Sequence, residues 1–382
     1  MAPLEHSPER KFKVIGQRPL RPDGIDKVTG RAQYGADLYV TNMLFAKVLR
    51  STHPHARIKS LNITAAESLP GVKAVVTSSD FNKINPDGPK DVLENCIAYD
   101  KVLYDGHAIA AVAAISNSIA IKALKLIKVE YEPLPFVIDV DEAMKEGAPI
   151  VNKGKGLENV PKGFSENVTS YYEFGHGDLN EGFSKADKII ERNFKTAAAH
   201  QGYIEPHACL ADTGKDGRSE IWCSSQGHFM VRSATANMLG WETSRIKVIP
   251  AEIGGGFGGK TTIYLEPLAV KLSEKADRPV KMVMSRDEVF KATGPTPGTK
   301  IRVKVGAKKS GVLTAGKAWL AYEAGPFGGS WAKIGGWCIF ASYNIPNVQI
   351  EAHEIIVNRP VNIAYRAPSA PMASYATESV LD

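Results

Sequence analysis

The sequence is poor in cysteine, and its four cysteines lie far apart. They are Cys96, Cys209, Cys223 and Cys338. No two of them form a C-x-x-C pair, so the sequence contains no local zinc-finger or iron–sulfur motif. Isolated thiols of this kind are typical of a protein from a reducing compartment.

Long apolar runs and long blocks of one charge are also missing. No apolar stretch approaches the roughly 20 residues that a membrane-spanning helix needs, so we expect no membrane span. Residues 1–17 are polar and lack the apolar core of a signal peptide. The 47 basic and 41 acidic residues are mixed along the chain, which favours a solvated surface over a nucleic-acid-binding face. These absences predict a cytoplasmic protein that binds no nucleic acid.

The chain is long enough for a large core and two or more domains, with 382 residues of which 43% are hydrophobic. Residues 1–23 read as an arm without periodicity. A β-β-α-β order predicts a small α/β domain over 24–135. Residues 136–170 are rich in loops and read as a linker. Residues 171–382 alternate strands with few helices, so the fold class we expect is α+β.

The most unusual stretch is Ile-Gly-Gly-Gly-Phe-Gly-Gly-Lys-Thr at residues 253–261, called the glycine loop below. Five glycines in six positions let the backbone adopt positive φ and approach a ligand closely. An alternating strand at 245–250 precedes the loop, and a helix at 265–276 follows it. A loop between strand and helix directs N–H groups at one point, which suits an anionic ligand.

Gln226 is a second candidate residue. It follows the strand that precedes the 245–250 strand in the sequence. That strand spans 220–225 and ends at Gln226. If the two strands are neighbours with the same direction, Gln226 and the glycine loop lie at one edge of the sheet.

The glycine loop also fits the P-loop pattern G-x-x-x-x-G-K-[ST] through Gly254, Gly259, Lys260 and Thr261. A downstream apolar strand followed by Asp287 resembles the acidic magnesium site of such proteins. A P-loop nucleoside triphosphatase is therefore an alternative. Against it, the chain after Asp287 is rich in strands and lacks the alternating helices of a parallel βα sheet.

The segment Gly-Gly-Gly-Phe-Gly-Gly-Lys resembles the signature loop of the molybdenum hydroxylases, the family of xanthine dehydrogenase and aldehyde oxidase. Further segments resemble that family in the same order: 27–30, 51–58, 224–226 and 364–378. Over about residues 20–382, the chain is similar to the N-terminal half of the molybdopterin-binding large subunit. Residues 24–135 resemble the α/β hammerhead domain, and 171–382 resemble the N-terminal part of an incomplete, mixed-sheet molybdopterin-binding domain.

The resemblance implies an oxidoreductase that hydroxylates a carbon with oxygen from water, at a molybdenum held by molybdopterin, in its plain or a dinucleotide form. It implies that Gln226 hydrogen-bonds an oxygen ligand of the metal. Phe257 and Gly258, with Gly256 beside them, would wall and contact the metal site. Arg366 would lie at the edge of the cofactor, where its guanidinium suits anionic groups.

The sequence departs from the purine-oxidising members at the positions that would face the substrate. Thr261 stands where they carry a glutamate, and Pro368 stands where they carry an aromatic residue. Residues 330–343 contain no arginine, and Met372 replaces a usual glutamine. The resemblance therefore implies an aldehyde, an N-heteroaromatic ring or a thioester-linked aromatic as substrate, and it does not select one of them.

The resemblance places the glutamate that activates the metal-bound hydroxyl beyond Asp382, so this chain is expected to hold no catalytic residue of its own. We expect either a fragment or one half of a split subunit, which should be inactive alone. Its expected partners are the C-terminal half, a [2Fe–2S] subunit and an FAD subunit. The helix from about Met372 is expected to bury one face against residues outside the chain. That face comprises Met372, Tyr375, Ala376, Ser379 and Val380.

Overall fold

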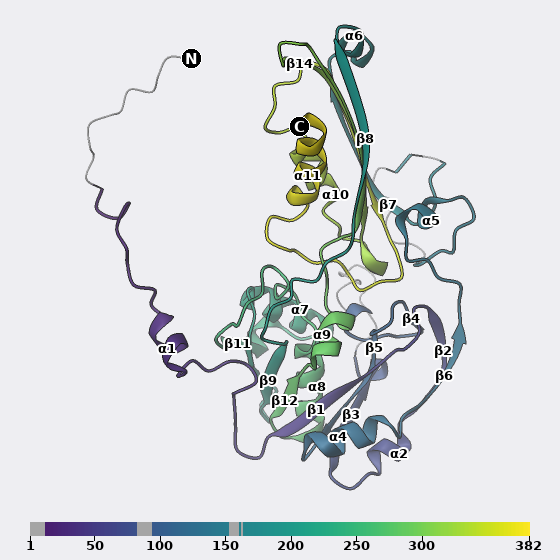
Figure 1. The fold of residues 1–382 in the computed structure, drawn as a ribbon. Coiled ribbons are helices and arrows are strands. Elements are labelled where there is room, and N and C mark those ends of the chain that lie inside the picture. Colours follow the sequence, from purple (N-terminus) through teal and green to yellow (C-terminus); the bar gives the residue numbers. More distant parts are fainter. Residues whose placement is uncertain (1–11, 82–93, 153–159, 162) are drawn as a thin grey trace.

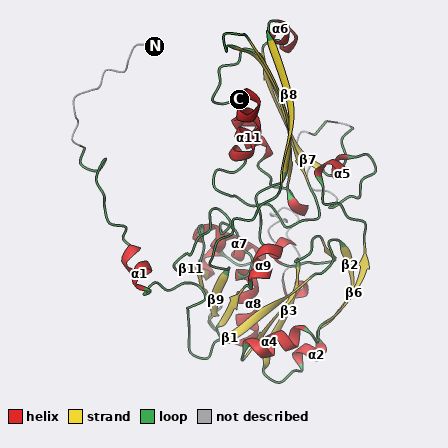
Figure 2. Ribbon diagram, viewed as in Figure 1, coloured by secondary structure: helices red, strands yellow, loops and turns green. Residues whose placement is uncertain are grey.

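A computed structural model describes residues 12–81, 94–152, 160–161 and 163–382; the first 11 residues of the predicted arm lie outside this range. Figure 1 shows that the described part of the arm extends away from the body of the molecule. Helix α1 (Gly24–Thr29), which follows the arm, is joined to the body by the ion pair of Lys27 with Glu252, at 2.7 Å. The body contains a seven-stranded sheet, a five-stranded sheet and a three-stranded sheet. Figure 2 shows that helices pack beside the strands of the two larger sheets.

The seven-stranded sheet has the order β11-β10-β9-β12-β1-β5-β3 and mixes parallel with antiparallel pairs. Its strands are β1 (Leu44–Arg50), β3 (Val72–Thr77), β5 (Ala108–Ala114), β9 (Ala208–Thr213), β10 (Ser219–Cys223), β11 (Ile246–Pro250) and β12 (Val280–Val283). Every residue of β5 is buried, which its Ala/Ile/Val sequence permits on both faces.

This sheet draws strands from both of the regions that were expected to form separate domains. Strand β1 pairs in parallel with β12, beginning at Leu44 opposite Val280. The two regions therefore share one hydrogen-bonded sheet and one apolar core. The α+β fold class, with mixed sheets, is confirmed, whereas the exact domain boundaries stay a prediction.

Helices cover the seven-stranded sheet and supply much of its core. They are α2 (Thr64–Glu67), α4 (Asn117–Leu124), α7 (His228–Leu239), α8 (Glu266–Ala276) and α9 (Arg286–Ala292), with 3₁₀ turns at Ser78–Asp80 and Thr243–Arg245. Helix α8 has Pro267 in its first turn, where a missing N–H does no harm. It packs on β9 and β3 through buried residues that include Leu268 and Leu272. The three-stranded sheet joins β4 (Lys101–Val102), β2 (Ala56–Asn62) and β6 (Lys128–Pro133).

The five-stranded sheet has the order β7-β15-β14-β13-β8. Its strands are β7 (Val168–His176), β8 (Lys188–Thr196), β13 (Thr299–Ala307), β14 (Leu313–Glu323) and β15 (Val348–Ile355). The remaining elements of this region are α6 (Leu179–Ser184), a 3₁₀ turn at Gly325–Phe327, α10 (Ala332–Cys338) and α11 (Ala370–Leu381). Strands β13 and β14 pair in antiparallel fashion and form a hairpin.

The expected role of the last helix was wrong in part. Met372, Ala376 and Val380 on α11 are buried against this chain's own five-stranded sheet, in one cluster with Ile301 and Leu320. Tyr375 and Ser379, which were placed on the same face, are exposed. A helix has 3.6 residues per turn, so the buried stripe runs through 372, 373, 376 and 380 and leaves 375 and 379 to solvent.

The segment expected as a linker over 136–170 carries structure of its own, within its described residues. It contains helix α5 (Val140–Met144), capped by Asp139. Val137, Val140 and Ala143 are buried in a cluster with Ile355 of β15. None of the described helices is long and apolar enough to cross a membrane. The cytoplasmic location stays a prediction.

Candidate functional site

The glycine loop and Gln226 lie at one edge of the seven-stranded sheet, as predicted. Strands β10 and β11 pair in parallel, so their carboxyl ends open on the same side. The Gln226 side-chain oxygen Oε1 accepts hydrogen bonds from the backbone N–H groups of Gly258 at 2.8 Å and Lys260 at 3.4 Å. The backbone N–H of Gln226 donates to the Lys260 carbonyl at 2.8 Å. One side chain thus fixes the second half of the glycine loop.

The glycines on either side of Phe257 have no room for a side chain. A Cβ at Gly256 would lie 2.4 Å from Oε1 of Gln226. A Cβ at Gly258 would lie 2.5 Å from the Ala364 carbonyl oxygen, and Gly258 has a φ of +102°. The loop is therefore pressed against Gln226 on one side and against the segment at 364–369 on the other.

Phe257 is held in a strained conformation at the outer side of the loop. Its φ is +51°, a value uncommon for a residue with a bulky side chain, and its side chain is 48% exposed. The Phe257 carbonyl accepts a hydrogen bond from the backbone N–H of Arg366 at 2.8 Å. Two further residues with positive φ, Ala367 and Ser369, follow Arg366. Positive φ at residues other than glycine is concentrated at these two segments, a pattern that favours a functional site.

The predicted site residues thus come together from three parts of the chain. Thr261 donates its hydroxyl to the Gly258 carbonyl at 2.8 Å and is partly exposed. Arg366 is exposed, and no carboxylate among the described residues pairs with its guanidinium. Pro368 is partly exposed and lies two residues after Arg366, on the segment that leads into α11.

Lys260 does not take the position that a P-loop lysine requires. Its Nζ lies 2.7 Å from Oε2 of Glu205, and its side chain is 0% exposed. Burial lowers the pKa of Lys260, while the hydrogen bond and charge of Glu205 act in the opposite direction. A lysine engaged in a buried ion pair is not available to nucleotide phosphates, so the structure argues against the triphosphatase alternative.

Glu205 is the residue of this region that sequence reasoning missed. Its Oε2 also accepts the backbone N–H of Gly254 at 2.7 Å, and its Oε1 accepts that of Gly35 at 3.3 Å. Beside it, the Tyr203 hydroxyl bonds Nε2 of His207 at 2.7 Å, and burial lowers the pKa of His207 well below its usual range. The sequence offers only Gly-Tyr-Ile-Glu-Pro here, in which nothing points to a partner 49 residues away.

The donors at this site fit a molybdopterin. The exposed Gln226 amide keeps its Nε2 donor, which bonds no acceptor among the described residues. The exposed guanidinium of Arg366 adds further donors and a positive charge. No group of three or more His, Cys, Asp or Glu residues suited to a metal occurs in the described part. Such a donor set suits a metal that is carried by an anionic organic ligand and not directly by protein side chains.

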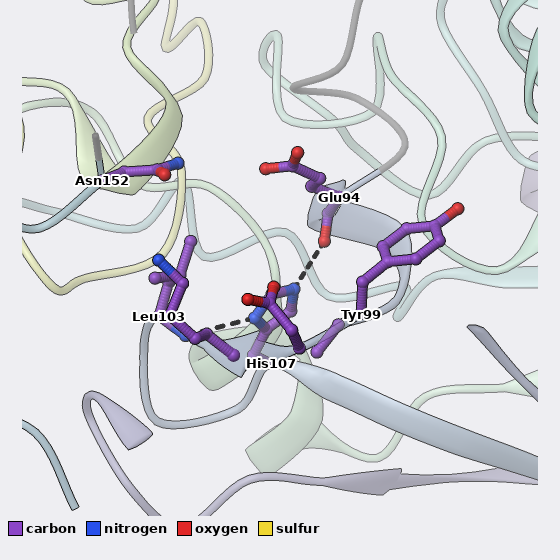
Figure 3. Close-up of a pocket in the computed structure, with 8 residues that line it drawn as sticks. Glu94, Tyr99, Leu103, His107 and Asn152 are labelled. Atoms are coloured by element: carbon purple, nitrogen blue, oxygen red, sulfur yellow. Dashed lines mark hydrogen bonds between the residues drawn. The ribbon is translucent and has the colours of Figure 1, made fainter. Parts of the chain in front are cut away.

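A separate pocket of about 310 Å³ lies beside β4 and β5 (Figure 3). Its lining includes Tyr99 and the buried His107. Both ring nitrogens of His107 are engaged, Nε2 with the Glu94 carbonyl at 2.6 Å and Nδ1 with the Leu103 N–H at 3.3 Å. Burial lowers the pKa of His107 to about 4. The pocket holds none of the predicted site residues and offers no histidine that is ready to accept a proton at neutral pH.

Comparison with known proteins agrees with the geometry. Residues 161–382 match the family model of the molybdopterin cofactor-binding domain. Residues 29–135 match that of the a/b hammerhead domain of aldehyde oxidase and xanthine dehydrogenase. Together the matches cover both large sheets.

Curated relatives support the same assignment. The chain is 30% identical to the nicotinate dehydrogenase large molybdopterin subunit of Eubacterium barkeri, over 98% of this chain and 86% of that subunit. It is 29% identical to the carbon monoxide dehydrogenase large chain of Afipia carboxidovorans, over 97% of this chain and 48% of the relative. The chain thus spans most of the first protein but about half of the second.

Among solved structures, quinoline 2-oxidoreductase from Pseudomonas putida 86 superimposes with a TM-score of 0.85 and 26% identity, over 97% of this chain and 48% of the other. The resemblance found in the glycine loop is thereby confirmed over nearly the whole chain. The chain belongs to the xanthine dehydrogenase and aldehyde oxidase family of molybdenum hydroxylases, whose hammerhead and molybdopterin cofactor-binding domains it carries.

Proposed function

We propose that this chain forms the molybdopterin side of an enzyme that hydroxylates a substrate carbon with oxygen from water. The balanced reaction takes one C–H bond and one water to a C–OH group, two protons and two electrons. The observation that carries the proposal is the contact of three segments, in which Gln226 bonds the Gly258 N–H and Arg366 bonds the Phe257 carbonyl. A bound molybdopterin supplies a molybdenum centre that accepts the two electrons.

Each predicted residue then has a role that its surroundings support. Gln226, fixed through Oε1, presents Nε2 as a hydrogen-bond donor to an oxygen ligand of the metal. Gly256 and Gly258 keep the backbone close because neither tolerates a Cβ. Phe257 provides an exposed apolar wall. Arg366 is an exposed cation beside the loop that pairs with no carboxylate of the described residues, and it balances the negative charge of the cofactor.

We propose an N-heteroaromatic substrate other than a purine. The side chains near the loop that would face it, Thr261 and Pro368, lack the carboxylate and the aromatic ring of the purine-oxidising relatives. Two similar proteins are named for nicotinate and quinoline, which supports a ring containing nitrogen. An aldehyde is the alternative, since an aldehyde oxidoreductase from Desulfovibrio gigas is also similar in structure.

We propose that the complete enzyme contains further polypeptide beside this chain. This chain covers 48% of the carbon monoxide dehydrogenase large chain, and the name of another relative, a large molybdopterin subunit, implies at least one further subunit in that enzyme. The activating glutamate would come from the C-terminal half, as a general base for the attacking hydroxyl. A [2Fe–2S] subunit and an FAD subunit would carry the electrons away.

The cofactor assignment is tested by a matched pair of glycine substitutions. Gly258 and Gly311 both have positive φ, at +102° and +85°, so alanine strains the backbone at either position. Only at Gly258 does the new Cβ meet another atom closely, whereas at Gly311 nothing lies within 4 Å. Molybdenum and pterin content is measured in the complex purified from its host. We expect Gly258→Ala to lose most of both and Gly311→Ala to keep them.

Equal cofactor content in the two variants, or a wild-type complex without molybdenum, would contradict the assignment. The reaction class has a separate test, in which the purified complex converts quinoline, nicotinate or benzaldehyde in ¹⁸O-labelled water, with an added artificial electron acceptor that takes up the two electrons. We expect ¹⁸O in a hydroxylated heteroaromatic product. If only benzaldehyde yields a labelled product, the substrate belongs to the aldehyde class instead.

A further inference from the structure

Glu205 connects three parts of the chain through one buried carboxylate. Its Oε2 accepts from the Gly254 N–H and from Nζ of Lys260, each at 2.7 Å. These two donors lie six residues apart, at the two ends of the glycine loop. Its Oε1 accepts from the Gly35 N–H at 3.3 Å, which adds the segment that precedes β1. A single oxygen thus links the two halves of the loop by holding Gly254 and Lys260.

The surroundings make this pair rigid. The side chains of Lys260 and Glu205 are 0% and 8% exposed. Nζ of Lys260 also lies 4.9 Å from the centre of the Tyr203 ring, within the range of a cation–π contact. A Cβ at Gly254 would lie 2.6 Å from that of Glu205. The loop and the Tyr203–Glu205 segment are therefore in close contact.

The Lys260 backbone transmits this constraint to Gln226. Its N–H donates to Oε1 of Gln226 at 3.4 Å, and its carbonyl accepts from the N–H of Gln226 at 2.8 Å and from the hydroxyl of Ser225 at 3.0 Å. A displacement of Lys260 therefore changes one of the two hydrogen bonds to the Gln226 amide oxygen, the other being donated by Gly258, and it also changes the bond that holds the Gln226 backbone. The buried pair lies behind the loop, while Gln226 and Phe257 are exposed on its outer side.

We infer that Glu205 and Lys260 are positioning residues, which fix the glycine loop and the Gln226 amide in the geometry that the cofactor site needs. The inference rests on the proposed function, because it assumes that this geometry serves to bind the cofactor. The lysine of the Gly-Gly-Lys sequence thus serves through its buried contact, not as a ligand for phosphate. The exposed Arg366 is then the cation assigned to the cofactor.

The test uses Glu205→Gln, Lys260→Met and the double variant, in the full chain within the complex purified from its host. The matched control is Lys275→Met, which removes a lysine bonded to Asp80 at 2.8 Å at the far end of α8. Hydrogen exchange compares the amides of residues 254–260 with those of β13 and β14 as an internal reference. Thermal unfolding and molybdenum content are measured on the same samples.

Each single variant leaves one buried partner uncompensated, so we expect a lower melting temperature. Loop amides should exchange at least about tenfold faster relative to the reference strands, which corresponds to a loss of about 1.4 kcal/mol in local protection. The double variant leaves no unpaired charge and should recover most of the melting temperature. Its loop should nevertheless exchange fast, and its molybdenum content should stay low. Lys275→Met should leave the ratio of loop to reference exchange unchanged.

The inference is overturned if the ratio of loop to reference exchange is unchanged in the single variants, whatever happens to the melting temperature. It is also overturned if the double variant regains a protected loop and full molybdenum, because the pair would then contribute stability alone. A failure of the proposed function looks different. In that case the wild-type complex contains no molybdenum, while the exchange ratio still responds to Glu205→Gln.

Discussion

The glycine loop and helix α11 are both packed against a sheet of this chain, but they are held by different kinds of contact. The loop is fixed by directional contacts: the Gln226 amide, the Glu205 carboxylate and glycines without room for a Cβ. Helix α11 is held by a stripe of apolar side chains, which includes Met372 and Val380, on the five-stranded sheet. Directional contacts fix atoms to a fraction of an ångström, whereas apolar burial fixes a helix face and tolerates repacking.

The two regions meet at the segment 364–369. This segment leads into α11, and its Arg366 N–H bonds the Phe257 carbonyl of the glycine loop. Apolar packing of α11 therefore supports the end of a segment whose other contacts are polar. A functional site at this junction depends on both sheets. The directional contacts of the loop and the apolar packing of α11 can each be tested separately.

Outside the glycine loop, the largest effect on stability is expected from Met372→Ala on α11. Met372 is buried in the cluster with Leu320, so its truncation should lower the free energy of unfolding by about 2–5 kcal/mol. Tyr375→Ala on the same helix is the control, because Tyr375 is 53% exposed and its ring meets that of Phe194 edge-on, so its truncation should cost about 0.5–1.5 kcal/mol. Chemical denaturation measures both. A larger cost at Tyr375 than at Met372 would mean that α11 is packed in another way.

A smaller effect is expected from His353→Phe, and it depends on pH. His353 is fully buried on β15 between the rings of Phe164, Tyr171 and Trp319, at centroid distances of 5.2 to 5.4 Å. Burial lowers the pKa of His353 to about 4, below its ordinary value of 6.5. The unfolded chain therefore binds more protons between these values. The neutral ring contributes fully above pH 6.5, and stability is lost as the pH falls toward 4.

His353→Phe should reduce the loss of unfolding free energy between about pH 6.5 and pH 4 by about 1–3 kcal/mol. The fall will not vanish, because burial also lowers the pKa of His107 and of His200 to about 4. Denaturation midpoints across this pH range provide the measurement. An unaltered slope in His353→Phe would contradict the buried neutral histidine.

The smallest effect on stability is expected from Lys247→Met. This variant tests whether burial, and not the distance between the charges, sets the strength of an ion pair. Lys247 lies 2.8 Å from Glu220 across β10 and β11, almost the same distance as in the Lys260–Glu205 pair. Its side chain is 67% exposed and that of Glu220 is 44% exposed. Solvent screening should limit the loss to about 0.2–1 kcal/mol, whereas breaking a buried pair costs about 3–5 kcal/mol. If thermal unfolding shows equal losses of stability in Lys247→Met and Lys260→Met, burial does not distinguish the two ion pairs.

Local patterns in the sequence predicted much of the region around the glycine loop. Alternation at 245–250 and a helical pattern from 265 correctly bracket the loop, since strand and helix periods are set by neighbouring residues. The same patterns place Gln226 beside the loop, because parallel neighbours open at the same edge. The resemblance to the family comes from short segments, among which the glycine loop is the most distinctive.

Tertiary structure alone decided which charges are paired and which faces are buried. Nothing near Lys260 in the sequence selects Glu205, since a buried ion pair forms between residues that the fold brings together. The pairing of β1 with β12 joins Leu44 to Val280, so the shared sheet is not visible in local patterns. The sequence showed that α11 has an apolar stripe; only the fold showed that this stripe is covered by the chain's own five-stranded sheet.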